Sequence, residues 1–362
     1  ENVAVDLTLQ TISYDIKTIF ANARNNTLIT GIQGNYQKNT NGNAPEYIIP
    51  DAFVNNIGFI GLFQSKVAQK INTQVGIRYD ILKINIPIQN YNTINSYDSS
   101  IIFPIENIYQ NISFSTGITY HINDIWLLRL NLASAFRPPN LAELTQNGLH
   151  GTRYEIGNPD MISQRNYESD FAIHFHSNNF ALDVSPFYNR INNYIFLSPS
   201  NDFTLEGYRI YRYDQTNATI YGGEVSGNYA NTYLKTGFSY SYLVGKQEDN
   251  SWLPFIPQNK LRGNIRLLAK KFWVFTNPFL QTSTVLALSQ NHPSIFETPT
   301  EKYNIWNISA GSSFNAAKTK FNWVLTINNL LNTTYYDHLS TLKDSGFYNM
   351  GRNISIAISI NF

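Results

Sequence analysis

The last nine residues of the chain, Ile354-Ser-Ile-Ala-Ile-Ser-Ile-Asn-Phe362, alternate between apolar and mostly small polar side chains. Side chains on a β-strand point alternately to opposite faces, so the four isoleucines and Phe362 share one face. Serine, alanine and asparagine occupy the other. The pattern predicts a strand with one apolar face, which fits both a soluble sandwich and a membrane barrel.

Composition favours the membrane barrel. Of the 362 residues, 14% are charged, below the roughly 25% typical of soluble globular domains, and 14% are aromatic, mostly the 24 Tyr and 23 Phe. Mean hydropathy is −0.27 and apolar runs stay as short as Ile125–Leu128, whereas a membrane helix needs about 20 apolar residues. Few charges, many aromatics and a negative hydropathy are together typical of a transmembrane β-barrel, where only alternate residues meet lipid.

Several classes of function are disfavoured. The net charge is +1, and we find no cluster of Lys and Arg with interleaved aromatics, so a nucleic-acid partner is not expected. The chain has no cysteine, which removes thiolate metal sites and disulfides. It contains no Gly-x-Ser-x-Gly, phosphate loop or His-Glu-x-x-His. We therefore expect neither an enzyme nor a resident cofactor.

Segments of alternating polarity predict about fifteen strands, most of them long enough for a tilted membrane strand. Their connectors alternate in length. Tight turns such as His121–Asp124 and Ser177–Asn179 alternate with longer loops such as Arg137–Arg165 and Ser198–Gly207. Outer-membrane barrels have short periplasmic turns and long outer loops, whereas a Greek-key sandwich need not keep this order. The sequence therefore predicts an all-β, antiparallel, up-and-down transmembrane barrel.

Aromatic residues stand beside the tight turns, as expected for a girdle at one membrane interface. They are Phe20, Tyr120, Trp126, Phe175, Tyr229, Trp273, Phe314, Trp323 and Phe362. Alternation agrees with this assignment, because Phe171, Ile173 and Phe175 share one face and leave His174 and His176 toward the lumen. We interpret these two histidines as channel lining; a metal site that uses both is the alternative.

Two groups of motifs occur in order: Ala135-Phe-Arg-Pro-Pro-Asn-Leu-Ala-Glu-Leu144 with Tyr154-Glu-Ile-Gly-Asn-Pro-Asp160, and Ile327-Asn-Asn-Leu-Leu-Asn332 with Gly351-Arg-Asn353. Together they resemble the TonB-dependent outer-membrane receptors over essentially the whole chain. Pro138, where alanine is usual, and Ser163-Gln164, where Pro-Glu is usual, depart from the family pattern. The resemblance implies uptake of a scarce nutrient across the bacterial outer membrane, powered by the TonB complex. Arg137, before two prolines, is expected to anchor its loop.

The resemblance also bears on domain organisation. Receptors of this family carry an N-terminal plug and a barrel of about twenty-two strands. We find neither a plug nor a TonB box, the predicted strand number is odd, and the chain starts directly in a strand-like pattern. We therefore expect residues 1–362 to form the C-terminal part of a receptor barrel. The TonB complex would then act through a plug outside this chain.

The predicted ligand site lies in the long loop between the first two motifs. In heme and zinc receptors of this family a histidine between comparable motifs contributes to ligand capture, and His150 has a similar place. Neutral imidazole suits iron or zinc, although a histidine here could also be a polar turn residue. The last outer loop could bring a second histidine to it above the lumen, although a surface histidine without a ligand is the more common outcome. The predicted ligand-binding residues are His150, Arg153, Tyr154, Glu155 and His338, with His150 as the metal ligand.

Three functions follow as hypotheses. The first is a receptor for a metal complex, such as heme, zinc or a ferric chelate, with carbohydrate or cobalamin left open. The second is a passive pore, or a barrel that docks a surface lipoprotein. The third, an outer-membrane hydrolase, rests on architecture alone. In all three the wall meets outer-membrane lipid, and the resemblance implies that Phe362 is the signal read by the barrel-assembly machinery; an accidental terminal Phe is the alternative.

Overall fold

The computed structural model describes residues 3, 5–22, 25–42, 49–91, 100–102, 104–151, 153–295, 297–316 and 319–361. Phe362, the predicted assembly signal, lies outside these residues. Within the described ranges the helix is α1 (Leu141–Thr145). No helix of this part of the chain is long and apolar enough to cross a membrane.

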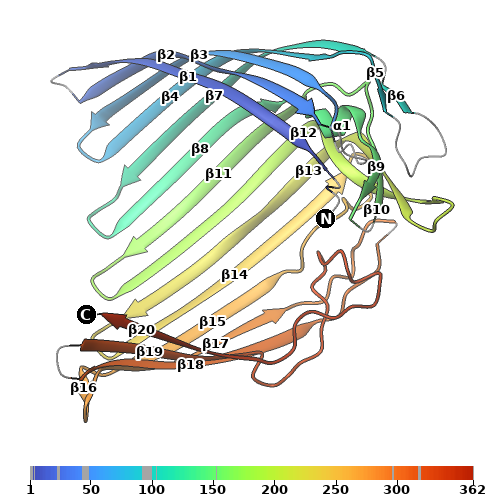
Figure 1. The fold of residues 1–362 in the computed structure, drawn as a ribbon. Coiled ribbons are helices and arrows are strands. Elements are labelled where there is room, and N and C mark those ends of the chain that lie inside the picture. The colour runs from blue at the N-terminus through green and yellow to red at the C-terminus, as the bar shows by residue number, and fades with distance from the viewer. Residues whose placement is uncertain are drawn as a thin grey trace.

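A single curved sheet of antiparallel strands follows the order of the chain (Figure 1). Among the described residues, its fifteen strands of nine residues or more are β1 (Leu7–Ala21), β2 (Asn26–Asn41), β3 (Ala52–Ala68), β4 (Ile71–Ile86), β7 (Ile105–His121), β8 (Trp126–Arg137), β11 (Gln164–His176), β12 (Phe180–Phe203), β13 (Arg209–Ala230), β14 (Leu234–Gln247), β15 (Lys260–Leu268), β17 (Phe275–Ala287), β18 (Tyr303–Ala316), β19 (Thr319–Asn328) and β20 (Asn353–Asn361). Each pairs with the next one in this list. The prediction of about fifteen up-and-down strands is confirmed.

Five short strands complete the described structure: β5 (Gln89–Tyr91), β6 (Ser100–Ile102), β9 (Asn147–His150), β10 (Arg153–Ile156) and β16 (Lys271–Phe272). The β9–β10 hairpin lies at the end of the wall where the long connectors gather (Figure 1). There β10 pairs in parallel with β13, which is the one parallel pairing among the described strands. The loop that holds the predicted site is therefore attached to the wall by a backbone ladder.

The segment Ser198–Gly207 corrects a prediction. It was expected as an outer loop, but β12 continues to Phe203 and the turn closes with a bond from Thr204 N to the Tyr208 carbonyl. The ladder continues because Ser198 and Pro199 still pair with β13, and a register irregularity follows Pro199. Serine and proline in this segment indicate the end of a strand at the level of sequence. In the structure the proline lies within the ladder, and the hairpin accommodates the irregularity.

The outward face of the wall is apolar, as the alternation predicted. In β20, Ile354, Ile356 and Ile358 are each more than 60% exposed, and their cross-strand partners in β19 are Ile327, Leu325 and Trp323. Because each of these side chains points away from the inner face, the row offers a hydrocarbon surface to lipid.

Aromatic contacts on this face gather beside the tight turns. Ring centroids are 4.7 Å apart for Trp126 and Phe175 and 5.1 Å apart for Phe314 and Phe321. Each pair lies near the end of its strands that adjoins a tight turn. The predicted aromatic girdle is therefore present at one rim.

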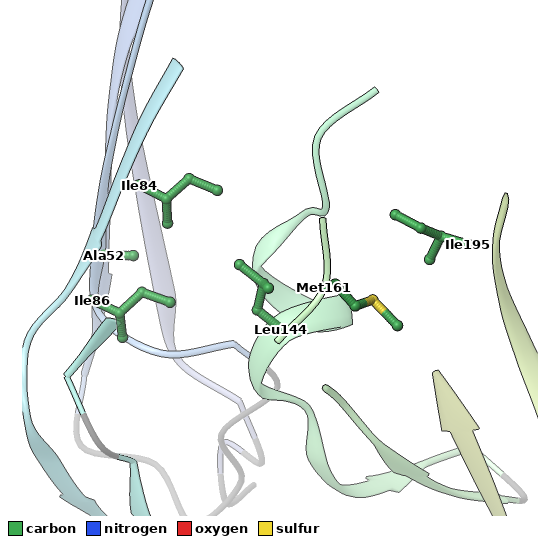
Figure 2. Packing of buried hydrophobic residues seen from close by; sticks show 6 residues of the cluster. All are labelled: Ala52, Ile84, Ile86, Leu144, Met161 and Ile195. Carbon is green, nitrogen blue, oxygen red and sulfur yellow. The ribbon is translucent and has the colours of Figure 1, made fainter. Parts of the chain in front are cut away.

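Buried apolar side chains lie instead under the long connectors. Figure 2 shows Leu144 of α1 facing Ile84 and Ile86 of β4, with Met161 on the side toward Ile195. A helix of five residues is unstable alone, so this packing must hold it. Leu144 is 1% exposed, and burying such a side chain contributes about 1.5–3 kcal/mol.

Candidate ligand-binding site

The first sequence motif builds a capped turn at the exit of β8. The Asn140 side chain accepts a bond from Glu143 N, and the Glu143 carboxylate accepts one from Asn140 N, both at 2.8 Å. This is a capping box, which satisfies two helix-terminal donors. Arg137 Nη1 donates to both oxygens of the same carboxylate at 2.8 Å. Arg137 thus anchors the loop, as predicted.

The second motif packs against the first. Asn158 N donates to the Glu143 carbonyl and Gly157 N to the Gln146 carbonyl, both at 2.7 Å. A Cβ at position 157 would lie 2.7 Å from the backbone nitrogens of Thr145 and Gln146, so only glycine permits this approach. These hydrogen bonds join the two motifs, and the β9–β10 hairpin lies between them in the chain.

Within that hairpin, the buried carboxylate of Glu155 contacts three side chains. Glu155 is 2% exposed. Its Oε1 accepts from Arg153 Nε at 2.6 Å and lies 3.2 Å from His150 Nδ1, while its Oε2 accepts from the Tyr213 hydroxyl at 3.2 Å. We call His150, Arg153, Glu155 and Tyr213 the Glu155 cluster. Arg153 supplies the compensating charge that a buried carboxylate needs.

Tyr213 belongs to the part of β13 beyond the membrane, because the strand has 22 residues and a spanning strand needs about 9–11. Burial, followed by the neighbouring charge of Glu155, raises the pKa of Tyr213 to about 12. Its hydroxyl therefore remains a proton donor to Glu155 at physiological pH.

The structure brings together three of the four residues predicted in this loop. Tyr154 points to the opposite face of β10 and donates to the Asn147 side chain at 2.8 Å. Sequence reasoning missed Tyr213, and also Tyr211, whose ring lies 5.2 Å from the Arg153 guanidinium. The alternation of two tyrosines in Tyr211-Arg-Tyr213 signals a shared face. Nothing in the sequence signals the parallel pairing that carries them to β10.

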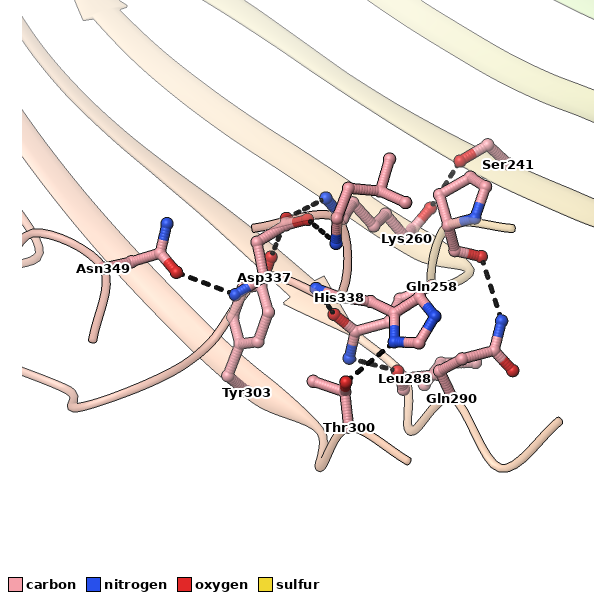
Figure 3. A network of polar contacts seen from close by, with 12 residues as sticks. Ser241, Gln258, Lys260, Leu288, Gln290, Thr300, Tyr303, Asp337, His338 and Asn349 are labelled. Atoms are coloured by element: carbon pink, nitrogen blue, oxygen red, sulfur yellow. Dashed lines mark hydrogen bonds and ion pairs between the residues drawn. The ribbon is translucent and has the colours of Figure 1, made fainter. Parts of the chain in front are cut away.

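His338 lies in a different environment from the one expected. Its side chain is 1% exposed, its Nδ1 is 2.8 Å from Thr300 Oγ1, and its backbone N–H donates to Gln258 (Figure 3). The described contacts of its ring are with Thr300 and, at 3.9 Å, Glu297, and not with His150. This corrects the expectation of a shared site. The last outer loop folds back onto the preceding one instead of reaching across the lumen.

The neighbouring acid explains that folding. Asp337 Oδ2 accepts from Lys260 Nζ at 2.6 Å and from the Tyr303 hydroxyl at 2.9 Å, and we call these three residues the Asp337 cluster (Figure 3). Burial raises the pKa of Asp337, but the bonds from Lys260, the Leu339 backbone and Tyr303 outweigh it and hold the pKa below its usual value. Asp337 thus remains a charged acceptor that fixes the loop.

Residues 4–330 match the family described as TonB dependent receptor-like, beta-barrel. The chain belongs to this family. It is 25% identical over 329 residues to the TonB-dependent heme receptor A of Haemophilus influenzae, a match that covers 79% of this chain and 42% of that protein. This chain therefore spans less than half of that relative's length.

Three solved structures share the fold at 13–15% identity. They are the copper transporter OprC (TM-score 0.78; 97% of this chain, 57% of that one), the FrpB iron transporter from Neisseria meningitidis (0.70; 97% and 55%) and the Serratia marcescens hemophore receptor HasR in complex with its hemophore and heme (0.69; 97% and 58%). TonB-dependent receptors are outer-membrane barrels of Gram-negative bacteria. The apolar face of the wall is the kind of surface that such a barrel turns toward lipid, and the long connectors gather at one end of the wall.

Hydrogen bonds also explain the C-terminal motif. Asn329 is 3% exposed, and its side chain bonds Thr333 in both directions at 2.8 Å and donates to the Met350 carbonyl at 3.4 Å. The Asn332 side chain accepts from Arg352 N at 2.9 Å. The two asparagines join the beginning and the end of the last outer loop, so β20 re-enters the wall beside β19.

Proposed function

We propose that this chain is part of an outer-membrane receptor that captures a metal complex at its outer loops for TonB-energised uptake. The observation that carries the proposal is the pairing of an accessible imidazole with a buried carboxylate. The His150 side chain is 56% exposed, whereas the Glu155 side chain beside it is 3% exposed. Membership of an outer-membrane barrel family supports an outward position for this pair, because the hairpin lies at the end of the wall where the long connectors gather.

The pairing suits a metal ligand. A histidine that binds a metal usually donates its other ring N–H to a carboxylate, which fixes the tautomer and the ring orientation. If His150 Nδ1 donates to Glu155, its Nε2 carries the lone pair that iron or zinc requires. Arg153 and Tyr213 hold the carboxylate in place for this task.

Heme is the ligand we propose to test first. The sequence relative is named as a heme receptor, and one structural neighbour was solved with a hemophore and heme. Heme iron also accepts an imidazole nitrogen. Zinc and a ferric chelate have the same requirement for a donor at the outer surface, so they are the alternative ligands in the experiment.

The complete gene product, purified from outer membranes in detergent, should bind hemin with a shift of its Soret absorbance. His150→Ala should weaken this binding at least tenfold. His292→Ala is the matched control, because His292 is another outer-loop histidine and stacks on Trp252 at 4.4 Å. Equal affinity of the wild type and His150→Ala for hemin and a ferric siderophore, with an equal number of bound Zn²⁺ ions, would remove His150 from any such site.

Energy dependence tests the transport step separately. Cells that express the complete gene product should use the bound complex as an iron or zinc source only when TonB is intact. Uptake that persists without TonB would favour the passive pore over the receptor.

A further inference from the structure

The inner face of β11 and β12 carries a second group of side chains of the types that bind metals, near the tight turn that joins the two strands. His174 and His176 alternate with Phe175, whose ring faces outward against Trp126. Both histidines therefore face the lumen. Asp183 of β12 is the direct cross-strand partner of His174, close to the tight turn that joins the two strands.

The donor atoms of the three side chains converge. Asp183 Oδ1 lies 2.6 Å from His174 Nδ1 and 2.8 Å from His176 Nε2. One donor atom of each residue lies within 4.8 Å of the donor atoms of the other two. In addition, His174 Nε2 is buried without a hydrogen-bond partner in the described structure. Two imidazoles aimed at one carboxylate oxygen form a compact set of donors.

Strand pairing explains this convergence. Directly opposite side chains on paired strands have Cβ atoms about 5 Å apart, and diagonal neighbours about 7–8 Å. His174 lies opposite Asp183, and His176, opposite Ala181, lies on its diagonal. The backbone ladder therefore sets the spacing of the three side chains. Within this chain their exposed fractions are 25%, 57% and 30%, so its own strands leave all three side chains partly open.

We propose that His174, His176 and Asp183 bind one divalent transition-metal ion at the periplasmic end of the lumen. Two imidazole nitrogens and a carboxylate oxygen suit borderline cations such as Zn²⁺, Cu²⁺ or Ni²⁺, and not Mg²⁺ or Ca²⁺. Metal–ligand bonds of about 2.0–2.2 Å place tetrahedral ligand atoms about 3.3 Å apart. Small side-chain rotations bring the observed distances to this value. Three protein ligands leave a position for water or for a passing ligand.

The surrounding residues favour a cation. On the same face of β11, Glu168 and Asp170 lie farther along the strand toward the outer side. On β8 the residue opposite His174 is the neutral Leu127, and Arg129 stands opposite Ala172. On β13 the residue opposite Asp183 is Ser226. Arg129 and Asp170 line one hollow of the inner face. No positively charged residue of the described strands lies directly opposite His174 or Asp183.

This proposal does not depend on His150, and the experiment separates the two sites. The complete gene product carrying His150→Ala, in detergent and stripped of metal by a chelator, is titrated with ZnCl₂ against a chromophoric zinc indicator. We expect one bound Zn²⁺ that a large excess of Mg²⁺ or Ca²⁺ does not displace. Adding His176→Ala or Asp183→Asn should weaken it at least tenfold.

The matched control is His121→Ala. His121 is also at the periplasmic end of a strand, but its ring nitrogen Nε2 lies 3.4 Å from the Asn72 amide. Zinc affinity should be unchanged in this variant. Cu²⁺ electron paramagnetic resonance gives a second readout, with coupling to two imidazole nitrogens that falls to one in His176→Ala. His176 is well exposed, so its variant should keep the heat-modifiable mobility of a folded barrel. Zinc affinity equal in the parent, His176→Ala and Asp183→Asn proteins would overturn the site.

Discussion

Two histidines in the outer loops show opposite uses of the same side chain. The His150 side chain is 56% exposed and lies at the edge of the Glu155 cluster, whereas the His338 side chain is 1% exposed and bonds Thr300. Each histidine lies beside an acid, which is the buried Glu155 for His150 and the partly exposed Asp337 for His338. Position in a long loop therefore does not determine whether a histidine can meet a ligand; the folding of the loop around its acid does.

The difference has a structural origin. His150 pairs with Arg153 across the turn of the β9–β10 hairpin, so Glu155 turns inward while the histidine remains at the rim. His338 directly follows Asp337, which Lys260 and Tyr303 hold against the wall. One loop presents its histidine because a hairpin ends there. The other encloses its histidine because two long connectors pack together.

Removing the buried acid of the first cluster should give the largest effect. Glu155→Ala leaves Arg153 and Tyr213 without their acceptor, and breaking a buried pair costs about 3–5 kcal/mol. We expect the hairpin to detach from β13, with loss of hydrogen-exchange protection in residues 147–156 and rapid cleavage there by protease.

Glu206→Ala is the control, because Glu206 is an exposed acid at the tip of the neighbouring hairpin. It should leave protection of residues 147–156 unchanged. Retained protection in Glu155→Ala would mean that the hydrogen bonds between the two motifs are enough to hold the hairpin. The comparison of Glu155 with Asp337 as acids that fix their loops would then lose its basis.

Acid should loosen the last outer loop, which holds His338. Burial lowers the pKa of His338 below its usual 6.5, although Glu297 opposes the shift. A histidine that is harder to protonate when folded contributes stability above pH 6.5, and that stability falls as the pH drops below it. The lowered pKa of Asp337 matters only near and below 3.8.

Hydrogen exchange of residues 331–350 at about pH 7.5 and about pH 5 measures this effect. We expect lower protection at the acid pH, and His338→Asn should remove the difference while lowering protection at both. Equal protection of the wild type at the two pH values would contradict a buried neutral His338.

The wall could be predicted from sequence far better than the outer loops. Alternation along Ile354–Asn361 depends on local geometry alone, and the neighbour of each wall strand is the next one in the chain, so both can be read residue by residue. The Glu155 cluster instead depends on β10 pairing with β13, more than fifty residues away. His150 was selected because the two motifs that flank it in the chain can be recognised from the sequence. Tyr213 was missed because its contact is not.

A smaller effect is expected from removing the N-terminal cap of α1. This helix supports only the loop that carries the Glu155 cluster. Asn140→Ala removes the bond to Glu143 N and should destabilise the helix by about 1 kcal/mol. Hydrogen exchange should rise in residues 141–146 and remain unchanged in residues 331–350. Asn140→Asp keeps a capping oxygen and should behave as the wild type. A rise in both regions would show that the two outer loops unfold as one unit.

The smallest effect on folding should come from the residue proposed to matter most for binding. The His150 ring is more than half exposed, so solvent screens its contact with Glu155, and Arg153 and Tyr213 still satisfy the carboxylate. His150→Asn should therefore change protection of residues 147–156 by less than about 0.5 kcal/mol while removing the ring nitrogen that we propose binds the ligand. If His150→Asn instead exposes the hairpin as strongly as Glu155→Ala, then His150 is a structural residue like His338, and a loss of ligand in its variants would report only a collapsed loop.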